Sequence, residues 1–249
     1  SLPAMAAAIL STDTVQLRDV PPLSDINNMV RLLGEIGCEV VHDDRTMTIR
    51  TVDPTANHAR YDIVRTMRAS ICVLGPLLAA RGEARVSMPG GCAIGDRPVD
   101  LHLRGLEALG ATITLDGGDI IARADKLKGA TIFLGGPFGS TVLGTANVMS
   151  AAVLAEGTTI IESAACEPEI TGLANMLNAM GADVSGAGTP RIEIHGVESL
   201  GNVDYQVIPD RIVAGTIAMA VAITNGDATL TNFPYDNLLA VLDRLTAAG

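Results

Sequence analysis

The chain has no tryptophan, and only three tyrosines and three phenylalanines stand among its 249 residues. Because 48% of the residues are nevertheless hydrophobic, the core has to be aliphatic, built from alanine, valine, isoleucine, leucine and methionine. No apolar run reaches the roughly 18 residues that a membrane-spanning helix needs, and nothing in this sequence resembles a secretion signal. We therefore expect a cytoplasmic protein without membrane contact.

Metal-binding and disulfide patterns are also missing. The four cysteines, Cys38, Cys72, Cys92 and Cys166, are widely separated, without a CxxC pair or a Cys/His spacing typical of a metal site. In a chain without an export signal they are expected to be free thiols. Three of them, all except Cys92, stand among aliphatic residues, and we expect these three to be inert thiols of the core.

Positive charge is scarce, since 17 lysines and arginines face 28 aspartates and glutamates, a net charge of −11. This balance argues against nucleic acid as a partner. The charges are unevenly spread, because the segment from Arg60 to Arg104 contains seven arginines and only four carboxylates. We expect a local basic field there that suits a small anion; a solvated surface with ordinary fluctuation is the alternative.

One pattern recurs four times: a helix of small apolar residues, a short strand, an amphipathic helix ended by glycine, and a hairpin. The glycines Gly37, Gly110, Gly181 and Gly249 are spaced about 70 residues apart, and a fixed period of this kind predicts one repeated supersecondary unit. The small-residue helices are expected at 4–10, 61–80, 140–155 and 211–224, each followed by a strand, at 14–20, 84–88, 158–162 and 228–232. The amphipathic helices are expected at 25–36, 98–109, 167–180 and 236–245, and the hairpins at 38–51, 111–124 and 182–195.

The repeat also predicts the domain organisation. Three copies complete an α/β domain over residues 1–208, and residues 202–211 look like a connection. Residues 209–249 are expected to begin a second, truncated domain, through which self-association is plausible because strand edges would be unpaired.

A thiol lies in a glycine-rich stretch that leads into a helix. Gly90, Gly91 and Gly95 surround Cys92, and Pro98 and Asp100 suit a helix start. An adjacent Arg97 and a helix N-terminus would lower the pKa of the thiol and attract a phosphate. The alternative is a glycine-rich connection that holds an incidental cysteine.

Seven short motifs resemble the enolpyruvyl transferases, in the same order along the whole chain. They are Thr66-Met67-Arg68-Ala69-Ser70, Leu74-Gly75-Pro76-Leu77, Pro89-Gly90-Gly91-Cys92, 97–102 (Arg-Pro-Val-Asp-Leu-His), 154–159, 167–170 and Pro209-Asp210-Arg211. The resemblance implies inside-out α/β barrels of three βαβαββ repeats, with helices inside, sheets outside, and an active site between two such domains.

The Gly-Gly-Cys loop and the Arg-Pro-Val-Asp strip are similar to the branch that acts on UDP-N-acetylglucosamine. This implies transfer of the enolpyruvyl group of phosphoenolpyruvate to the sugar 3′-hydroxyl with release of phosphate, without a metal or redox cofactor. In that branch the reaction begins peptidoglycan synthesis, for cell-wall growth, shape and division, and is the target of fosfomycin. The alternatives are transfer to shikimate 3-phosphate and a non-catalytic binding or scaffold module.

Residue roles follow from the resemblance alone. Cys92 matches the mobile-loop cysteine that adds to phosphoenolpyruvate. Arg68 and Arg97 match phosphate-binding arginines, and Arg97 also borders the uracil. The strip expected at the uracil and its neighbours comprises Pro98, Val99, Asp100, Leu101 and His102; for His102 a hydrogen-bonded structural role is the alternative, and for Arg68 a helix-surface position.

The resemblance weakens in one loop. Ser140, Thr141, Val142 and Gly144 align with the segment that binds the diphosphate and uridine, but the lysine usual there is absent. Asp210 and Arg211 match a hinge between domains. Because the family's catalytic Lys-Asn pair and aspartate fall outside this sequence, we expect the chain alone to have little transferase activity.

Overall fold

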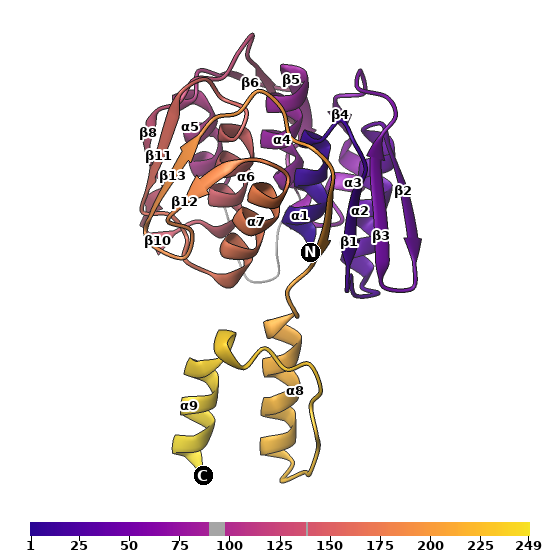
Figure 1. The fold of residues 1–249 in the computed structure, drawn as a ribbon, viewed down its shortest axis with the longest axis vertical. Helices are drawn as coiled ribbons and strands as arrows, with labels where there is room; N and C mark the ends of the chain where they lie inside the picture. The colour runs from indigo at the N-terminus through magenta and orange to yellow at the C-terminus, as the bar shows by residue number, and fades with distance from the viewer. Residues whose placement is uncertain (90–97, 138) are drawn as a thin grey trace. The chain divides into compact units, whose positions relative to one another are not determined.

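The computed structural model describes residues 1–89, 98–137 and 139–249 (Figure 1). The chain divides into two compact units, Ser1–Gln206 (unit 1) and Val207–Gly249 (unit 2). Unit 1 contains three four-stranded sheets and the helices that pack on them, so it holds nearly all of the tertiary structure.

The three sheets of unit 1 share one topology, which confirms the repeat seen in the sequence. Within each sheet the first two strands are parallel and the remaining neighbours antiparallel. In order across the sheets, the strands are β14 (Val203–Gln206), β1 (Val15–Arg18), β3 (Thr46–Thr51) and β2 (Cys38–Asp43); β4 (His58–Ala59), β5 (Glu83–Ser87), β7 (Asp119–Arg123) and β6 (Thr112–Asp116); and β8 (Thr131–Phe133), β11 (Thr158–Glu162), β13 (Arg191–His195) and β12 (Asp183–Ser185).

One of these strands corrects the expectation for residues 202–211. β14 lies in that segment and pairs in parallel with β1, from Val15↔Val203 to Arg18↔Gln206. Each sheet therefore takes its first strand from the end of the preceding repeat, and the third repeat supplies the first sheet. This exchange joins the three repeats into a closed ring.

Three inner helical segments fill the space between the sheets (Figure 1). They are α1 (Leu2–Ala7) with the 3₁₀ helix η1 (Ala8–Leu10), η2 (Arg68–Val73) with α4 (Leu74–Arg81), and α6 (Val142–Ala152). Nine of the eleven residues of α6 are buried, as expected for a helix enclosed on all sides. The outer helices α2 (Ser24–Glu35), α5 (Asp100–Ala108) and α7 (Pro168–Ala179) leave solvent-facing residues between buried ones.

The helix expected over 61–80 is interrupted. It comprises α3 (Tyr61–Val64), η2 and α4, and Met67 between α3 and η2 is extended, with φ −150° and ψ 124°. The amphipathic helix expected from Pro98 begins at Asp100 instead, with Val99 as its N-cap. Apolar periodicity marked both segments as helical but did not reveal where the hydrogen-bond ladder stops.

Unit 2 is helical, with α8 (Arg211–Ile223), η3 (Tyr235–Asn237) and α9 (Leu239–Ala248). The strand expected over 228–232 is absent, because those residues have no neighbouring strand to pair with in the described chain. Asp210 caps α8, since its Oδ1 accepts from the N–H groups of Ile212 and Val213 at 2.9 and 3.0 Å. That 209–249 begins a second barrel stays a prediction.

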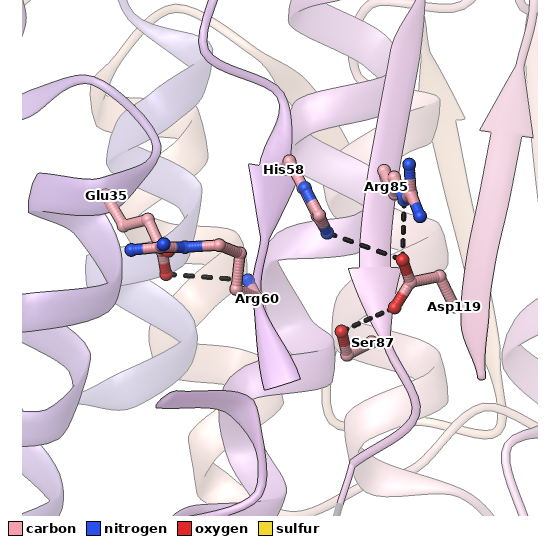
Figure 2. Close-up of polar contacts among 6 residues, drawn as sticks. All are labelled: Glu35, His58, Arg60, Arg85, Ser87 and Asp119. Atoms are coloured by element: carbon pink, nitrogen blue, oxygen red, sulfur yellow. Dashed lines mark hydrogen bonds and ion pairs between the residues drawn. The ribbon is translucent and has the colours of Figure 1, made fainter. Parts of the chain in front are cut away.

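A polar cluster joins three strands of the second sheet around Asp119 (Figure 2). The Asp119 carboxylate accepts from Arg85 Nε and Ser87 Oγ, both at 2.5 Å, and its Oδ2 lies 3.4 Å from Nε2 of His58. Desolvation raises the pKa of this carboxyl, but the hydrogen bonds from Ser87 and Arg85 together lower the pKa by more. The net pKa therefore lies below its usual range. Because the residue is only 8% exposed, the ionised form depends on these partners.

We expect Asp119→Asn to lower the free energy of unfolding by about 1–3 kcal/mol at pH 7, since it weakens charge-assisted hydrogen bonds in a buried cluster. A carboxyl whose pKa is depressed in the folded state stabilises the fold at pH values above its unfolded pKa of about 3.9. This stabilisation is lost as the pH falls through the pKa of the folded state. The difference between the two proteins in urea unfolding should therefore shrink below about pH 4.

Asp116→Asn is the matched control, because Asp116 pairs with Asp119 across β6 and β7 but is exposed. Equal losses in both variants, or a difference that does not change with pH, would contradict the prediction.

Candidate active site

The residues expected to bind substrate stand at the starts of helices. Arg68 is the first residue of η2, Asp100 of α5 and Val142 of α6. Thr141 is the N-cap of α6, and its Oγ1 accepts from the Gly144 N–H at 3.2 Å. Cys92 and Arg97 lie outside the described residues, so their expected roles stay predictions. N-terminal helix turns present N–H groups and favour anions.

The beginning of α5 packs against the segment that leads into α6. A Cβ built on Gly136 would lie 3.2 Å from Cδ1 of Leu101, so the two residues are in close contact. Gly136 belongs to β9 (Gly135–Gly136), which pairs with β10 (Gly139–Ser140). Arg104 of α5 also donates to the carbonyls of Phe133 and Gly135. Two segments expected to bind the nucleotide are therefore neighbours in the fold.

His102, in the first turn of α5, is buried, with 3% exposure. Its Nδ1 lies 3.0 Å from Nδ2 of Asn147 in α6. The pKa of His102 is lowered to about 4 by burial and by the positive charge of Arg68, against the opposing effect of Asp100. The ring is thus neutral at pH 7. The hydrogen-bonded role is what the structure describes, while a contact with uracil stays a prediction.

The basic field expected between Arg60 and Arg104 stays a prediction, but two of its seven arginines are paired with carboxylates and three more contact neutral groups. Their guanidinium groups have other partners: Arg60 pairs with Glu35 and Arg85 with Asp119 (Figure 2), Arg65 lies 5.9 Å from the ring centroid of Tyr61, Arg81 donates to the carbonyls of Ile36 and Ala56, and Arg104 donates to those of Phe133 and Gly135. A charge count along the sequence does not show which guanidinium groups are already used. Of the described arginines in this segment, Arg68 is the one whose charge acts on His102.

The cysteine prediction holds for two residues and fails for one. Cys38 and Cys72 are buried, at 5% and 2% exposure. Cys166 is exposed, in the connection between β11 and α7. The preceding Ala164 and Ala165 are buried, so the aliphatic neighbours in the sequence turn inward while the thiol turns outward.

Asn147 was not predicted from the sequence. This side chain is fully buried in α6, and it contacts η2, α4 and α5 through hydrogen bonds. The available signal was a single amide within a run of small and apolar residues on a helix expected to be enclosed. A buried amide has to find several partners, so such a residue indicates a junction between elements.

Comparison with known proteins identifies the family of the chain. The family model described as EPSP synthase (3-phosphoshikimate 1-carboxyvinyltransferase) matches residues 1–249. The chain belongs to this enolpyruvyl transferase family. Solved structures of the family share its fold: the enolpyruvyl transferase NikO from Streptomyces tendae has a TM-score of 0.75 at 24% identity, over 87% of this chain and 51% of that one. EPSP synthase from Acinetobacter baumannii has a TM-score of 0.66 at 19% identity, over 90% and 51%.

Curated relatives are more similar in sequence. UDP-N-acetylglucosamine 1-carboxyvinyltransferase of Methylacidiphilum infernorum (isolate V4) is 49% identical over 249 residues, and that of Akkermansia muciniphila is 48% identical over 250 residues. This enolpyruvyl transferase chain is covered completely, and it spans 59% of the length of each relative.

The comparisons confirm the predicted fold class, an α/β barrel of the enolpyruvyl transferase type with its helices inside and its sheets outside. Among the described residues, no helix combines the length and the apolar character needed to cross a membrane.

Proposed function

We propose that this chain forms one wall of an active site that transfers the enolpyruvyl group of phosphoenolpyruvate to the 3′-hydroxyl of UDP-N-acetylglucosamine, in peptidoglycan synthesis. The observation that carries the proposal is that Arg68 and Asp100, at the starts of η2 and α5, act on neutral His102, while Leu101 contacts the segment that leads into α6. In the sequence, the Cys92 stretch leads directly into α5. The names of the relatives favour this sugar over shikimate 3-phosphate.

The described residues suit anionic ligands. Arg68, with Arg97, is assigned to phosphate groups, because a guanidinium binds two phosphate oxygens at once. Ser140, Thr141 and the N–H groups at the start of α6 are assigned to the diphosphate in place of the missing lysine. Since Thr141 Oγ1 accepts from Gly144, its hydroxyl hydrogen remains available to donate to a phosphate oxygen.

The reaction balances without a metal or redox cofactor. The 3′-oxygen adds to C2 of phosphoenolpyruvate while a proton adds to C3, and the hydroxyl proton leaves. The C2–O bond to phosphate then breaks and a proton leaves C3, which gives an enolpyruvyl ether and inorganic phosphate. Cys92 is assigned to this site as a proton donor or as a thiol that adds to phosphoenolpyruvate. The same proposal includes a cytoplasmic location and a possible self-association through unit 2.

The effect of ligands on the alkylation of Cys92 tests the proposal. A Cys166→Ser chain is treated with an epoxide of the fosfomycin type, and alkylation of Cys92 is followed by mass spectrometry, with Cys92→Ala to assign the modified peptide. We expect UDP-N-acetylglucosamine to change the rate of Cys92 alkylation at least about tenfold, because the ligand and the thiol share one site. Shikimate 3-phosphate should have no effect.

An equal effect of shikimate 3-phosphate would favour the other branch of the family. No effect of either ligand, also after the remaining length of the relatives is restored, would favour a scaffold without substrate binding.

A further inference from the structure

The amide of Asn147 lies where three helical elements meet. Its Oδ1 accepts from the Gly75 N–H at 2.5 Å, and its Nδ2 lies 2.8 Å from the Ile71 carbonyl oxygen and 3.0 Å from His102 Nδ1. The residue has 0% exposure, so the oxygen and both N–H groups are used entirely within the protein. Loss of such partners in a buried site is costly.

The orientation of this amide is fixed by its backbone partners. The oxygen and nitrogen of an asparagine are commonly assigned from the surrounding hydrogen bonds. Here the Gly75 N–H can only donate and the Ile71 carbonyl can only accept. The oxygen must therefore face Gly75, and the NH₂ group must face Ile71 and His102.

The same two backbone groups lie at the junction where the 3₁₀ helix η2 passes into α4. Residues 71 and 75 are four apart, so in a continuous α-helix the Gly75 N–H would bond to the Ile71 carbonyl. Here the Gly75 N–H bonds to the Asn147 amide instead, while the Ile71 carbonyl accepts from the Leu74 N–H and from Asn147 Nδ2. Arg68 begins η2, so Asn147 connects the elements that carry Arg68 and His102.

Two glycines allow this close approach. A Cβ on Gly75 of α4 would lie 2.2 Å from the Asn147 carbonyl oxygen, and a Cβ on Gly105 of α5 would lie 2.4 Å from Cγ2 of Val148. Both α4 and α5 pack on α6. The short side chain of Asn147 reaches both neighbours because neither helix has a Cβ at its contact point.

The amide also decides which nitrogen of His102 carries the proton. Because Asn147 Nδ2 donates to Nδ1, that nitrogen must present its lone pair, and the neutral ring carries its hydrogen on Nε2. A second proton on Nδ1 would face another N–H group. The charges that act on the ring, Arg68 from η2 and Asp100 from α5, oppose each other, with burial and Arg68 favouring the neutral form.

We infer that Asn147 is a positioning residue that holds His102, in the first turn of α5, as a neutral hydrogen-bond donor through Nε2. Its relevance to enolpyruvyl transfer rests on the proposed function; the proton position does not. The arrangement gives the nucleotide strip a donor whose charge does not change near pH 7. It also makes Nδ1 of His102 unavailable as a general base.

The proton position is measured on the whole chain without any substrate. The sequence has four histidines, so ¹⁵N-histidine labelling and long-range ¹H–¹⁵N NMR resolve few signals, and His102→Gln assigns the one of interest. We expect His102 to carry its proton on Nε2 from pH 8 to pH 5. A proton on Nδ1, or a doubly protonated ring at pH 6, would overturn the inference.

Asn147→Asp tests the cause with almost no change of shape. An ionised carboxylate accepts instead of donating, so His102 should move its proton to Nδ1 and show a pKa raised by at least about one unit. Thr145→Val is the matched control on α6, since it removes a buried hydrogen bond from the Ala165 N–H at 3.1 Å without touching His102. This control should lose stability and keep the proton on Nε2.

An unchanged proton position in folded Asn147→Asp, or a changed one in Thr145→Val, would overturn the role of Asn147. If the Asp variant does not fold, the spectrum of the unmodified chain still decides the proton position. Absence of any ligand effect on Cys92 would remove the proposed function and leave this NMR result standing.

Discussion

Gly75→Ala is expected to lower the free energy of unfolding of unit 1 by at least about 3 kcal/mol. The new methyl group would lie 2.2 Å from the backbone oxygen of Asn147 and 2.6 Å from its Oδ1. Contacts this short cannot be relieved by rotating a flexible side chain, so α4 and α6 have to separate. The separation also stretches the hydrogen bond between the Gly75 N–H and the Asn147 amide, which adds the cost of unpaired buried polar groups.

Gly34→Ala provides the control for this prediction. Gly34 is also inside a helix, α2, but a Cβ there meets nothing within 4 Å. Alanine is the better helix former by up to about 1 kcal/mol, so this variant should become more stable. Urea unfolding followed by circular dichroism compares the two proteins. A loss below about 1 kcal/mol at position 75, or the same sign at both positions, would contradict the close packing described for α4 and α6.

Alkylation of the native chain at pH 8 is expected to modify Cys166 at least about a thousandfold faster than Cys72, because only thiolates react and the fraction ionised falls tenfold per pKa unit. Cys72 lies in η2 at 2% exposure, and burial raises its pKa to about 12 despite a smaller opposing effect of the nearby Arg68. Cys166 is exposed. The reagent also reaches Cys72 only when the structure opens.

Quenched labelling with iodoacetamide, read by mass spectrometry of the cysteine peptides, measures both rates. In a denaturing concentration of urea the two cysteines should react at similar rates, which controls for local sequence effects. Rapid native labelling of Cys72, at a rate that denaturant leaves unchanged, would contradict its burial. The same data show why Cys166→Ser is the appropriate background for experiments on Cys92.

The repeat could be predicted because its markers are local. Gly37, Gly110 and Gly181 adopt φ values of 80°, 96° and 106° at the ends of helices, which side chains other than glycine adopt rarely. The first strands of the sheets were not predicted, because β4 has two residues and β8 three. Such strands are too short for an alternating pattern, and their pairing depends on a partner in another repeat.

The candidate site was predictable only in part. The resemblance supplied Arg68, Asp100 and His102, and the structure brings the charges of Arg68 and Asp100 to bear on His102. Asn147 was missed because its partners come from segments 45 to 76 residues away, and no local pattern specifies such contacts. The arginine count did not show that Arg60 and Arg85 pair with Glu35 and Asp119, because such ion pairs are likewise made between residues distant in the sequence.

The parallel pairing of β14 with β1 also bears on how the chain folds as it is synthesised. Ser11, near β1, donates to the Gly201 carbonyl, 190 residues along the chain. Until residue 206 has left the ribosome, β1 and its hairpin have no parallel neighbour and leave one sheet edge open. Contacts this remote in sequence slow folding and expose intermediates to association. The ring of repeats therefore closes only when β14 pairs with β1.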